Sequence, residues 1–159
     1  MGDRLELITR RLRDEGDKMS LFFRALQLAD WELQIYPGDM GEPWSLRHLL
    51  AHQLSAERGF HLLALGILQG GEGSPVGMNI DAFNAKEVIC LENQSPAGLL
   101  DSLLAARQQN IDLLQSLAEA DLDREGRHPF FGWTTLEKLF KLIYRHNMLH
   151  IRDVKRVVG

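Results

Sequence analysis

Four segments of this chain, each about 20 residues long or longer, carry apolar side chains at the spacing of a helix. They cover residues 4–30, 44–69, 96–120 and the region that follows residue 135. No stretch shows a convincing strand pattern, and segments rich in Gly and Pro separate the four. An isolated amphipathic helix cannot bury its own apolar face, so four of them must pack together. The pattern therefore predicts an all-α chain that folds as a four-helix bundle.

Two of the predicted helices have clear start signals. Ser95 is a good N-cap, and Pro96 fits the first helical position, where its missing N–H costs nothing. Thr134 or Thr135 is expected to cap the last helix, with Glu137 placed to complete a capping box with Thr134.

The connections between the helices differ greatly in length. Residues 35–43 are dense in helix breakers and are expected to form a loop. The second connection is long, runs to residue 94 and is predicted to contain a short helix over residues 82–91. A long connection in a compact domain usually has a functional role. No repeat or break in composition divides the chain, so residues 1–159 are expected to form a single domain.

The composition excludes several classes of protein. The formal net charge of −4 argues against electrostatic binding to nucleic acid. The longest apolar stretches end well short of the roughly 20 residues that a membrane span needs. The charged residues near Met1 leave no apolar run for a signal peptide, and we expect a cytoplasmic protein.

The single cysteine, Cys90, excludes an internal disulfide and Cys-rich zinc sites, and it suits a reducing cytoplasm. Cys90 lies in the apolar run Val88-Ile89-Cys90-Leu91, so we expect a small buried residue rather than a nucleophile.

A pair of histidines in the last helical segment indicates a metal site. His146 and His150 are one helical turn apart and fall within the apolar stripe of that segment. An imidazole that faces a core needs a partner, and a metal ion is one such partner. The alternative is that each histidine bonds to its own carbonyl or carboxylate. Spacing alone does not decide between them, so the question is whether a third ligand exists.

The best candidate for a third ligand lies in the second helical segment. By helical angle His52 lies at the edge of the apolar stripe, whereas His48 is rotated toward solvent and is kept in reserve. His61 falls on the polar side, and His128 precedes a proline in a loop. Three neutral imidazoles on one divalent ion would leave a position open for water or substrate, which is typical of a catalytic site. A His-Glu-x-x-His zinc protease motif is absent.

Three stretches of the sequence together resemble the DinB-like superfamily, whose members are small four-helix metalloproteins. They are Trp44-Ser-Leu-Arg-His-Leu-Leu-Ala-His52, Asp81-Ala-Phe-Asn84-Ala and His146-x-x-x-His150-Ile-Arg. The resemblance covers nearly the whole chain, including the long connection between the second and third helices of the bundle. It implies that His52, His146 and His150 hold one divalent metal, with water completing the open positions. Relatives include mycothiol-dependent maleylpyruvate isomerase and bacillithiol transferases.

The resemblance suggests a metal-dependent enzyme, with a transferase that uses a low-molecular-weight thiol as the leading hypothesis. A metal-dependent hydrolase is the close alternative, because an open metal position can activate either a thiol or water. A non-catalytic stress protein that binds metal or a small molecule, and a plain dimerisation bundle, are alternatives of other classes.

The remaining expectations concern the ligands of such a site. Zinc or nickel is the expected metal, with iron, copper and cobalt as alternatives that three histidines also suit. Asp81 and Asn84 are expected at the mouth of the pocket, together with His48, although a helix N-cap explains Asp81 equally well. The expected partner is a small-molecule substrate, with no nucleic acid and no membrane, and a homodimer stays open.

Overall fold

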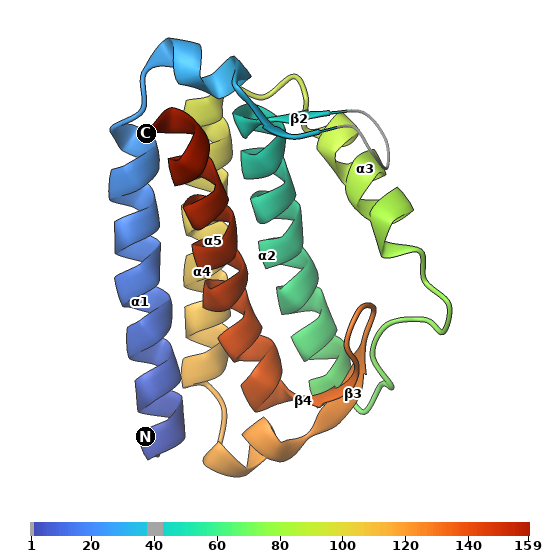
Figure 1. Ribbon diagram of the computed structural model, residues 1–159. Coiled ribbons are helices and arrows are strands. Elements are labelled where there is room, and N and C mark those ends of the chain that lie inside the picture. Colours follow the sequence, from blue (N-terminus) through green and yellow to red (C-terminus); the bar gives the residue numbers. More distant parts are fainter. Residues whose placement is uncertain (1, 38–42) are drawn as a thin grey trace.

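The computed structural model describes residues 2–37 and 43–159 and shows a four-helix bundle with an additional helix on its outside (Figure 1). The helices of this part of the chain are α1 (Asp3–Arg24), α2 (Leu46–Leu68), α3 (Ile80–Cys90), α4 (Pro96–Gln115) and α5 (Leu136–Val158). α3 packs against α2 and stands apart from the other three helices. The prediction of an all-α bundle with a long second connection is confirmed.

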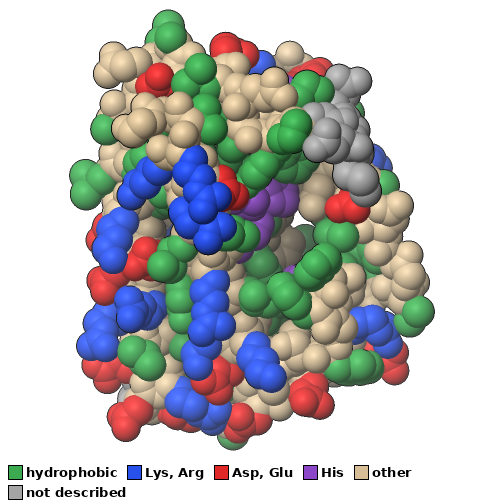
Figure 2. Space-filling model, in the orientation of Figure 1, with side chains coloured by type: hydrophobic (Ala, Val, Ile, Leu, Met, Phe, Trp, Pro, Cys, Tyr) green, Lys and Arg blue, Asp and Glu red, His purple; other side chains and the backbone are tan. Residues whose placement is uncertain are grey.

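The arrangement of the helices follows from that long connection. α1 and α2 lie diagonally across the bundle, and each packs against both α4 and α5. The connection that contains α3 carries the chain back along the bundle, so that α2 and α4 run in the same direction (Figure 1). A short turn would have made them antiparallel. Charged side chains cover the outer faces of α1 and α5 (Figure 2).

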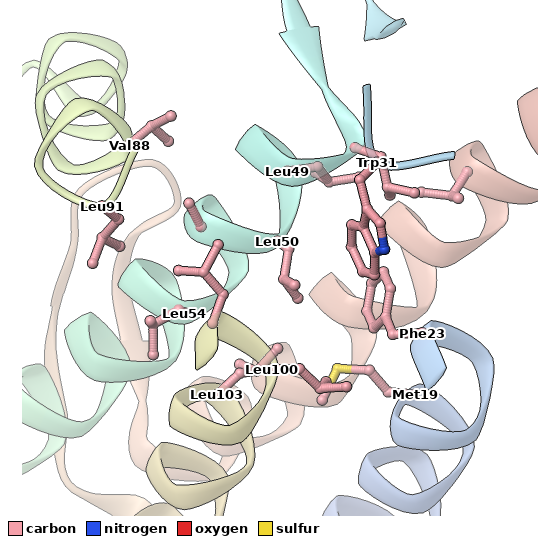
Figure 3. Close-up of a cluster of buried hydrophobic side chains, with 14 of the residues drawn as sticks. Met19, Phe23, Trp31, Leu49, Leu50, Leu54, Val88, Leu91, Leu100 and Leu103 are labelled. Atoms are coloured by element: carbon pink, nitrogen blue, oxygen red, sulfur yellow. The ribbon is translucent and has the colours of Figure 1, made fainter. Parts of the chain in front are cut away.

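The core consists of two apolar clusters, one toward each end of the bundle. The upper cluster joins α1, α2 and α4 around side chains such as Phe23, Leu50 and Leu103 (Figure 3). The lower cluster includes Leu12, Phe140 and other buried residues of the four long helices. Full burial of one such side chain contributes about 1.5–3 kcal/mol, so these clusters account for most of the driving force for folding.

A buried polar layer separates the two apolar clusters. Its centre is the ion pair of Arg107 with Glu57, in which Arg107 Nε and Nη2 donate to Oε1 and Oε2 at 2.7 and 3.0 Å. Arg107 also donates to the backbone carbonyl of Leu12 at 2.9 Å and to the side-chain oxygen of Asn147. These four residues belong to α4, α2, α1 and α5. The guanidinium of Arg107 therefore links α4 to the three other long helices.

Two of the long helices end earlier than the sequence predicts. α1 ends at Arg24 rather than near residue 30, and α4 ends at Gln115 rather than near residue 120. A 3-10 helix follows each, over Leu28–Glu32 and Glu119–Asp123. In both, an aspartate side chain accepts from a backbone N–H three residues earlier, which favours a new helical start over continuation.

The cap of α4 is as expected, and α5 is capped by Thr135, one of the two predicted candidates, but without the predicted capping box. Ser95 Oγ accepts from Gly98 N at 3.1 Å, with Pro96 at the first helical position. For α5 the N-cap is Thr135, whose side chain accepts from Lys138 N, so the capping box of Thr134 with Glu137 is wrong. Thr134 is instead a buried strand residue, because the chain enters α5 from a hairpin.

Two short antiparallel hairpins precede α2 and α5. The sequence pattern does not predict these hairpins. β1 (Gln34–Tyr36) pairs with β2 (Trp44–Ser45), and β3 (Glu125–His128) pairs with β4 (Gly132–Thr135). β1 and β2 lie in and beside the predicted loop over 35–43, of which residues 38–42 lie outside the described residues. Strands of two to four residues are too short to show an alternating pattern.

Cys90 is exposed at the end of α3, so the prediction of a buried cysteine is wrong. Val88 and Leu91 of the apolar run are buried in the core, whereas Ile89 and Cys90 between them face outward. In the described part of the chain, no helix combines the length and apolar character required to cross a membrane.

We expect Arg107→Met to destabilise the fold by about 3–5 kcal/mol, because it leaves the Glu57 carboxylate buried without its partner. The free energy of unfolding from urea denaturation measures the effect. Arg24→Met is the matched control, since Arg24 and its partner Asp101 are both exposed and such pairs contribute about 0–1 kcal/mol. A loss below about 1 kcal/mol for Arg107→Met would contradict the assigned importance of the polar layer.

Candidate metal centre

α2 and α5 bring three histidines together on their facing sides. His52 lies in the second turn of α2, and His146 and His150 lie on successive turns of α5. The i, i+4 spacing gives the α5 pair a common direction, with ring centroids 4.4 Å apart. Because α2 packs directly against α5, the ring of His52 meets both of them, at centroid distances of 5.0 and 5.2 Å.

The Nε2 atoms of the three rings point at one another. His52 Nε2 lies 3.1 Å from His146 Nε2, which lies 2.9 Å from His150 Nε2. One nitrogen from each ring can be chosen so that all three lie within 4.8 Å of one another. Two ligands that lie about 2.0–2.1 Å from a common ion at the tetrahedral angle are about 3.3–3.4 Å apart, so the observed distances are a few tenths of an ångström shorter than those of a metal site.

Burial keeps the three imidazoles neutral. The pKa of each of His52, His146 and His150 is lowered to about 3, first because burial removes water from the charged ring and second because a neighbouring histidine would repel it. Asp153 opposes the shift at His150. A neutral imidazole offers a lone pair, which is the form that binds a metal.

The hydrogen-bond partners also fit a metal. Nδ1 of His52 is buried and has no partner among the described residues, so the polar interactions of this ring are confined to Nε2. His150 has a partner for its Nδ1, the hydroxyl of Tyr36 at 2.7 Å. Three nitrogens that face one another at this distance need shared protons or a cation between them, because bare lone pairs repel. The residues present therefore fit a divalent ion that prefers nitrogen ligands.

The other histidines are engaged elsewhere. His48 Nδ1 accepts from the backbone N–H of Ser45 at 3.1 Å and so takes part in the cap of α2. His61 Nδ1 lies 3.3 Å from Asn110 Oδ1. His128 Nδ1 accepts from two backbone N–H groups of the β3–β4 turn. None of these three belongs to the histidine cluster.

A cleft of about 500 Å³ lies between α3 and the β1–β2 hairpin, next to the histidines. Tyr36 and Trp44 line it, and they contact the cluster through His150 and His52 respectively. Figure 2 shows histidine side chains at the edge of a hollow on this face. The three clustered histidines do not themselves line the cleft, which adjoins them through Tyr36 and Trp44.

The three residues expected at the pocket mouth, Asp81, Asn84 and His48, all line this cleft. The N-cap of α3 is Asn79, whose side chain accepts from Ala82 N at 3.0 Å, so the capping role suggested for Asp81 is wrong. Tyr36 was missed by the sequence analysis, since it lies in the segment predicted to be a loop.

The sequence was compared with models of known protein families and with curated proteins. The family model described as the DinB superfamily matches residues 8–154. A search of curated proteins gives no match.

Solved structures resemble the fold over nearly the full chain. YfiT from Bacillus subtilis, described as a probable metal-dependent hydrolase with an unusual four-helix bundle topology, gives a TM-score of 0.77 at 18% identity, covering 99% of this chain and 87% of YfiT. Mycothiol-dependent maleylpyruvate isomerase gives 0.77 at 15% identity, and the match covers 97% of this chain but 63% of that protein. The colibactin self-resistance protein ClbS, solved with double-stranded DNA, gives 0.73 at 12%, covering 98% and 95%.

Each of the single variants His52→Ala, His146→Ala and His150→Ala should weaken metal binding by more than about 100-fold, because loss of a ligand exceeds the roughly 10–100-fold effect of a supporting residue. Metal content after purification without a polyhistidine tag, followed by competition with a chelator, measures this. His61→Ala and His128→Ala are the matched controls and should keep their metal. Full retention by His52→Ala, with loss by His48→Ala, would contradict the assignment.

We expect the metal-free protein to lose stability as the pH falls from 6.5 toward 3. In the unfolded chain these histidines take up protons near pH 6.5, whereas in the folded protein they do so only near pH 3. Between these values the unfolded state binds more protons, so acid favours unfolding. Urea denaturation at several pH values should show a shallower dependence for His146→Ala than for wild type, by up to about 1.4 kcal/mol per pH unit. Equal slopes would contradict the buried neutral cluster.

Proposed function

The chain belongs to the DinB superfamily, and we propose that it is a metal-dependent enzyme that transfers or rearranges groups with the help of a low-molecular-weight thiol. The observation that carries the proposal is the convergence of the His52, His146 and His150 Nε2 atoms beside an accessible cleft. The three histidines would hold one divalent ion. Zinc or nickel is the first choice, and iron, copper or cobalt also suits three imidazoles.

A divalent ion supplies Lewis acidity, which lowers the pKa of a thiol or of water so that the nucleophile forms near neutral pH. The contribution of the chain is to keep three imidazoles neutral and pre-aligned. It does so by burial and by their placement on two packed helices, so little reorganisation is needed when the ion binds.

The cleft would bind the organic part of the substrate. Its wall combines aromatic and aliphatic side chains, such as Trp44, Val88 and Ile89, with the polar groups of Asp81 and Asn84. Such a mixture is typical of small-molecule sites, where apolar contacts supply affinity and a few polar groups fix orientation. α3 belongs to the long connection, which supports the expectation that this connection is functional.

A metal-dependent hydrolase is the second candidate. YfiT, which is described as a probable metal-dependent hydrolase, matches this chain over more of its own length than the mycothiol-dependent isomerase does. The same three histidines serve either reaction, because Lewis acidity activates water as well as a thiol.

The proposed partner is a small-molecule substrate. We propose that the protein acts without nucleic acid, on the basis of the net charge of −4. The ClbS structure contains double-stranded DNA, so DNA binding is the relevant negative control for this chain.

The test is turnover by the metal-loaded protein. Incubation with bacillithiol, mycothiol or glutathione and a panel of electrophiles should give metal-dependent loss of free thiol and formation of the conjugate. The rate should rise with pH as the bound thiol loses its proton. His150→Ala should abolish the reaction, and His61→Ala, which changes a histidine outside the cluster, should leave it intact.

Metal-dependent hydrolysis of ester or amide substrates, without formation of a thiol conjugate, would contradict the transferase proposal and support the hydrolase. Metal binding without turnover of either kind would favour a binding protein. Purified protein without near-stoichiometric metal would contradict both enzymatic proposals.

A further inference from the structure

We propose that Tyr36 and Asp153 are positioning residues that fix the tautomer of His150 and so present its Nε2 lone pair to the metal. The inference rests on the metal site of the proposed function and goes beyond it, because it assigns roles to two residues outside the ligand set. Its basis is a continuous hydrogen-bonded chain. Tyr36 Oη lies 2.7 Å from His150 Nδ1 and 2.7 Å from Asp153 Oδ2.

The direction of each hydrogen bond in the series Asp153–Tyr36–His150 follows from counting protons. A carboxylate can only accept, so the single proton of the Tyr36 hydroxyl is donated to Asp153. The same hydroxyl can then only accept from His150, which requires the proton of the neutral ring to be on Nδ1. It follows that Nε2 of His150 carries the lone pair, and this is the atom that faces the other two histidines.

This arrangement matches the way that proteins support metal-binding histidines. A ligating histidine commonly donates its second ring nitrogen to an oxygen acceptor, which fixes the ring orientation and increases the basicity of the ligand. Here the acceptor is a tyrosine hydroxyl whose electron density is increased by hydrogen bonding to a carboxylate. Asp153 is one helical turn beyond His150 on α5, so the carboxylate and the ligand share one rigid element.

Tyr36 comes from a different element, and this gives the contact a second consequence. It belongs to β1, lines the cleft and also packs edge-on against the ring of His150, at a centroid distance of 5.9 Å. One side chain therefore joins the wall of the cleft to a metal ligand. A substrate that displaces Tyr36 would change the support of His150 as well.

The first experiment measures the affinity of the metal-free protein for Zn²⁺ by competition with a chromophoric chelator. Tyr36→Phe removes only the hydroxyl and should weaken binding about 10–100-fold. Tyr144→Phe is the matched control: it removes a tyrosine hydroxyl from α5, where the ring packs against the lower apolar cluster. Its affinity should stay within about twofold of wild type. An equally small effect of Tyr36→Phe would overturn the inference.

The second experiment tests whether Asp153 acts through Tyr36. Asp153→Ala should weaken Zn²⁺ binding in the wild-type background. It should have little further effect in the Tyr36→Phe background, because the hydrogen bonds from Asp153 to His150 are already interrupted there by the loss of the Tyr36 hydroxyl. Losses of Zn²⁺ affinity that add up in the double variant would show that Asp153 does not act through Tyr36, and would overturn the inference. Far-UV circular dichroism of every variant confirms that the bundle remains folded.

The third experiment observes the tautomer directly in metal-free protein. The ¹⁵N chemical shifts of the His150 ring, assigned by loss of its signals in His150→Ala, should show the proton on Nδ1. They should move toward the Nε2–H form in Tyr36→Phe and stay unchanged in Tyr144→Phe. A His150 ring protonated on Nε2 in the wild type would overturn the inference. Wild type that shows the Nδ1–H form but binds no metal would instead overturn the proposed function.

Discussion

The buried ion pair between Arg107 and Glu57 is the interaction on which the geometry of the bundle depends. Apolar clusters above and below it give the driving force for burial, but hydrophobic attraction has no direction. The donors of a guanidinium do have fixed directions, so each misplaced partner would leave a buried charge or dipole unsatisfied. Asn147, which also accepts from Arg107, is next to His146 in the sequence. A slip of one helical turn would move a ring by about 5.4 Å, well beyond the 3.1 Å that separates His52 from His146.

Much of the fold and the composition of the histidine cluster could be predicted from the sequence, because both depend on periodicity. The apolar repeat indicates the long helices, and the helical angle favours His52 over His48. Features fixed by contacts distant in sequence were missed. Tyr36 meets Asp153 across more than a hundred residues, and no local pattern marks that pair. The hairpins and early helix ends were missed because a few hydrogen bonds of single side chains decide them.

The candidate site combines two environments that serve different purposes. On the bundle side, burial removes water and holds the imidazoles neutral, which costs stability in acid but keeps three lone pairs ready for a cation. On the cleft side, β1 and α3 lie outside the bundle core and provide a partly polar surface. Tyr36 belongs to both environments. The spacing of the three histidines is set by two packed helices, whereas the cleft beside them is lined mainly by α3 and the β1–β2 hairpin.

In the proposed function, the three histidines would present the same nitrogens to the ion whether the nucleophile is a thiol or water. The side chains that line the cleft would therefore decide between the two nucleophiles. Among the described residues that line the cleft, Asp81 and Glu92 are acidic and none is Lys or Arg. A thiol with free carboxylates would therefore find no cationic side chain on this wall and would face repulsion there. A neutral or cationic substrate that packs against Trp44 and Ile89 is compatible with the same surface. Under the proposed function, the charge of the cleft would favour uncharged thiols over polyanionic ones.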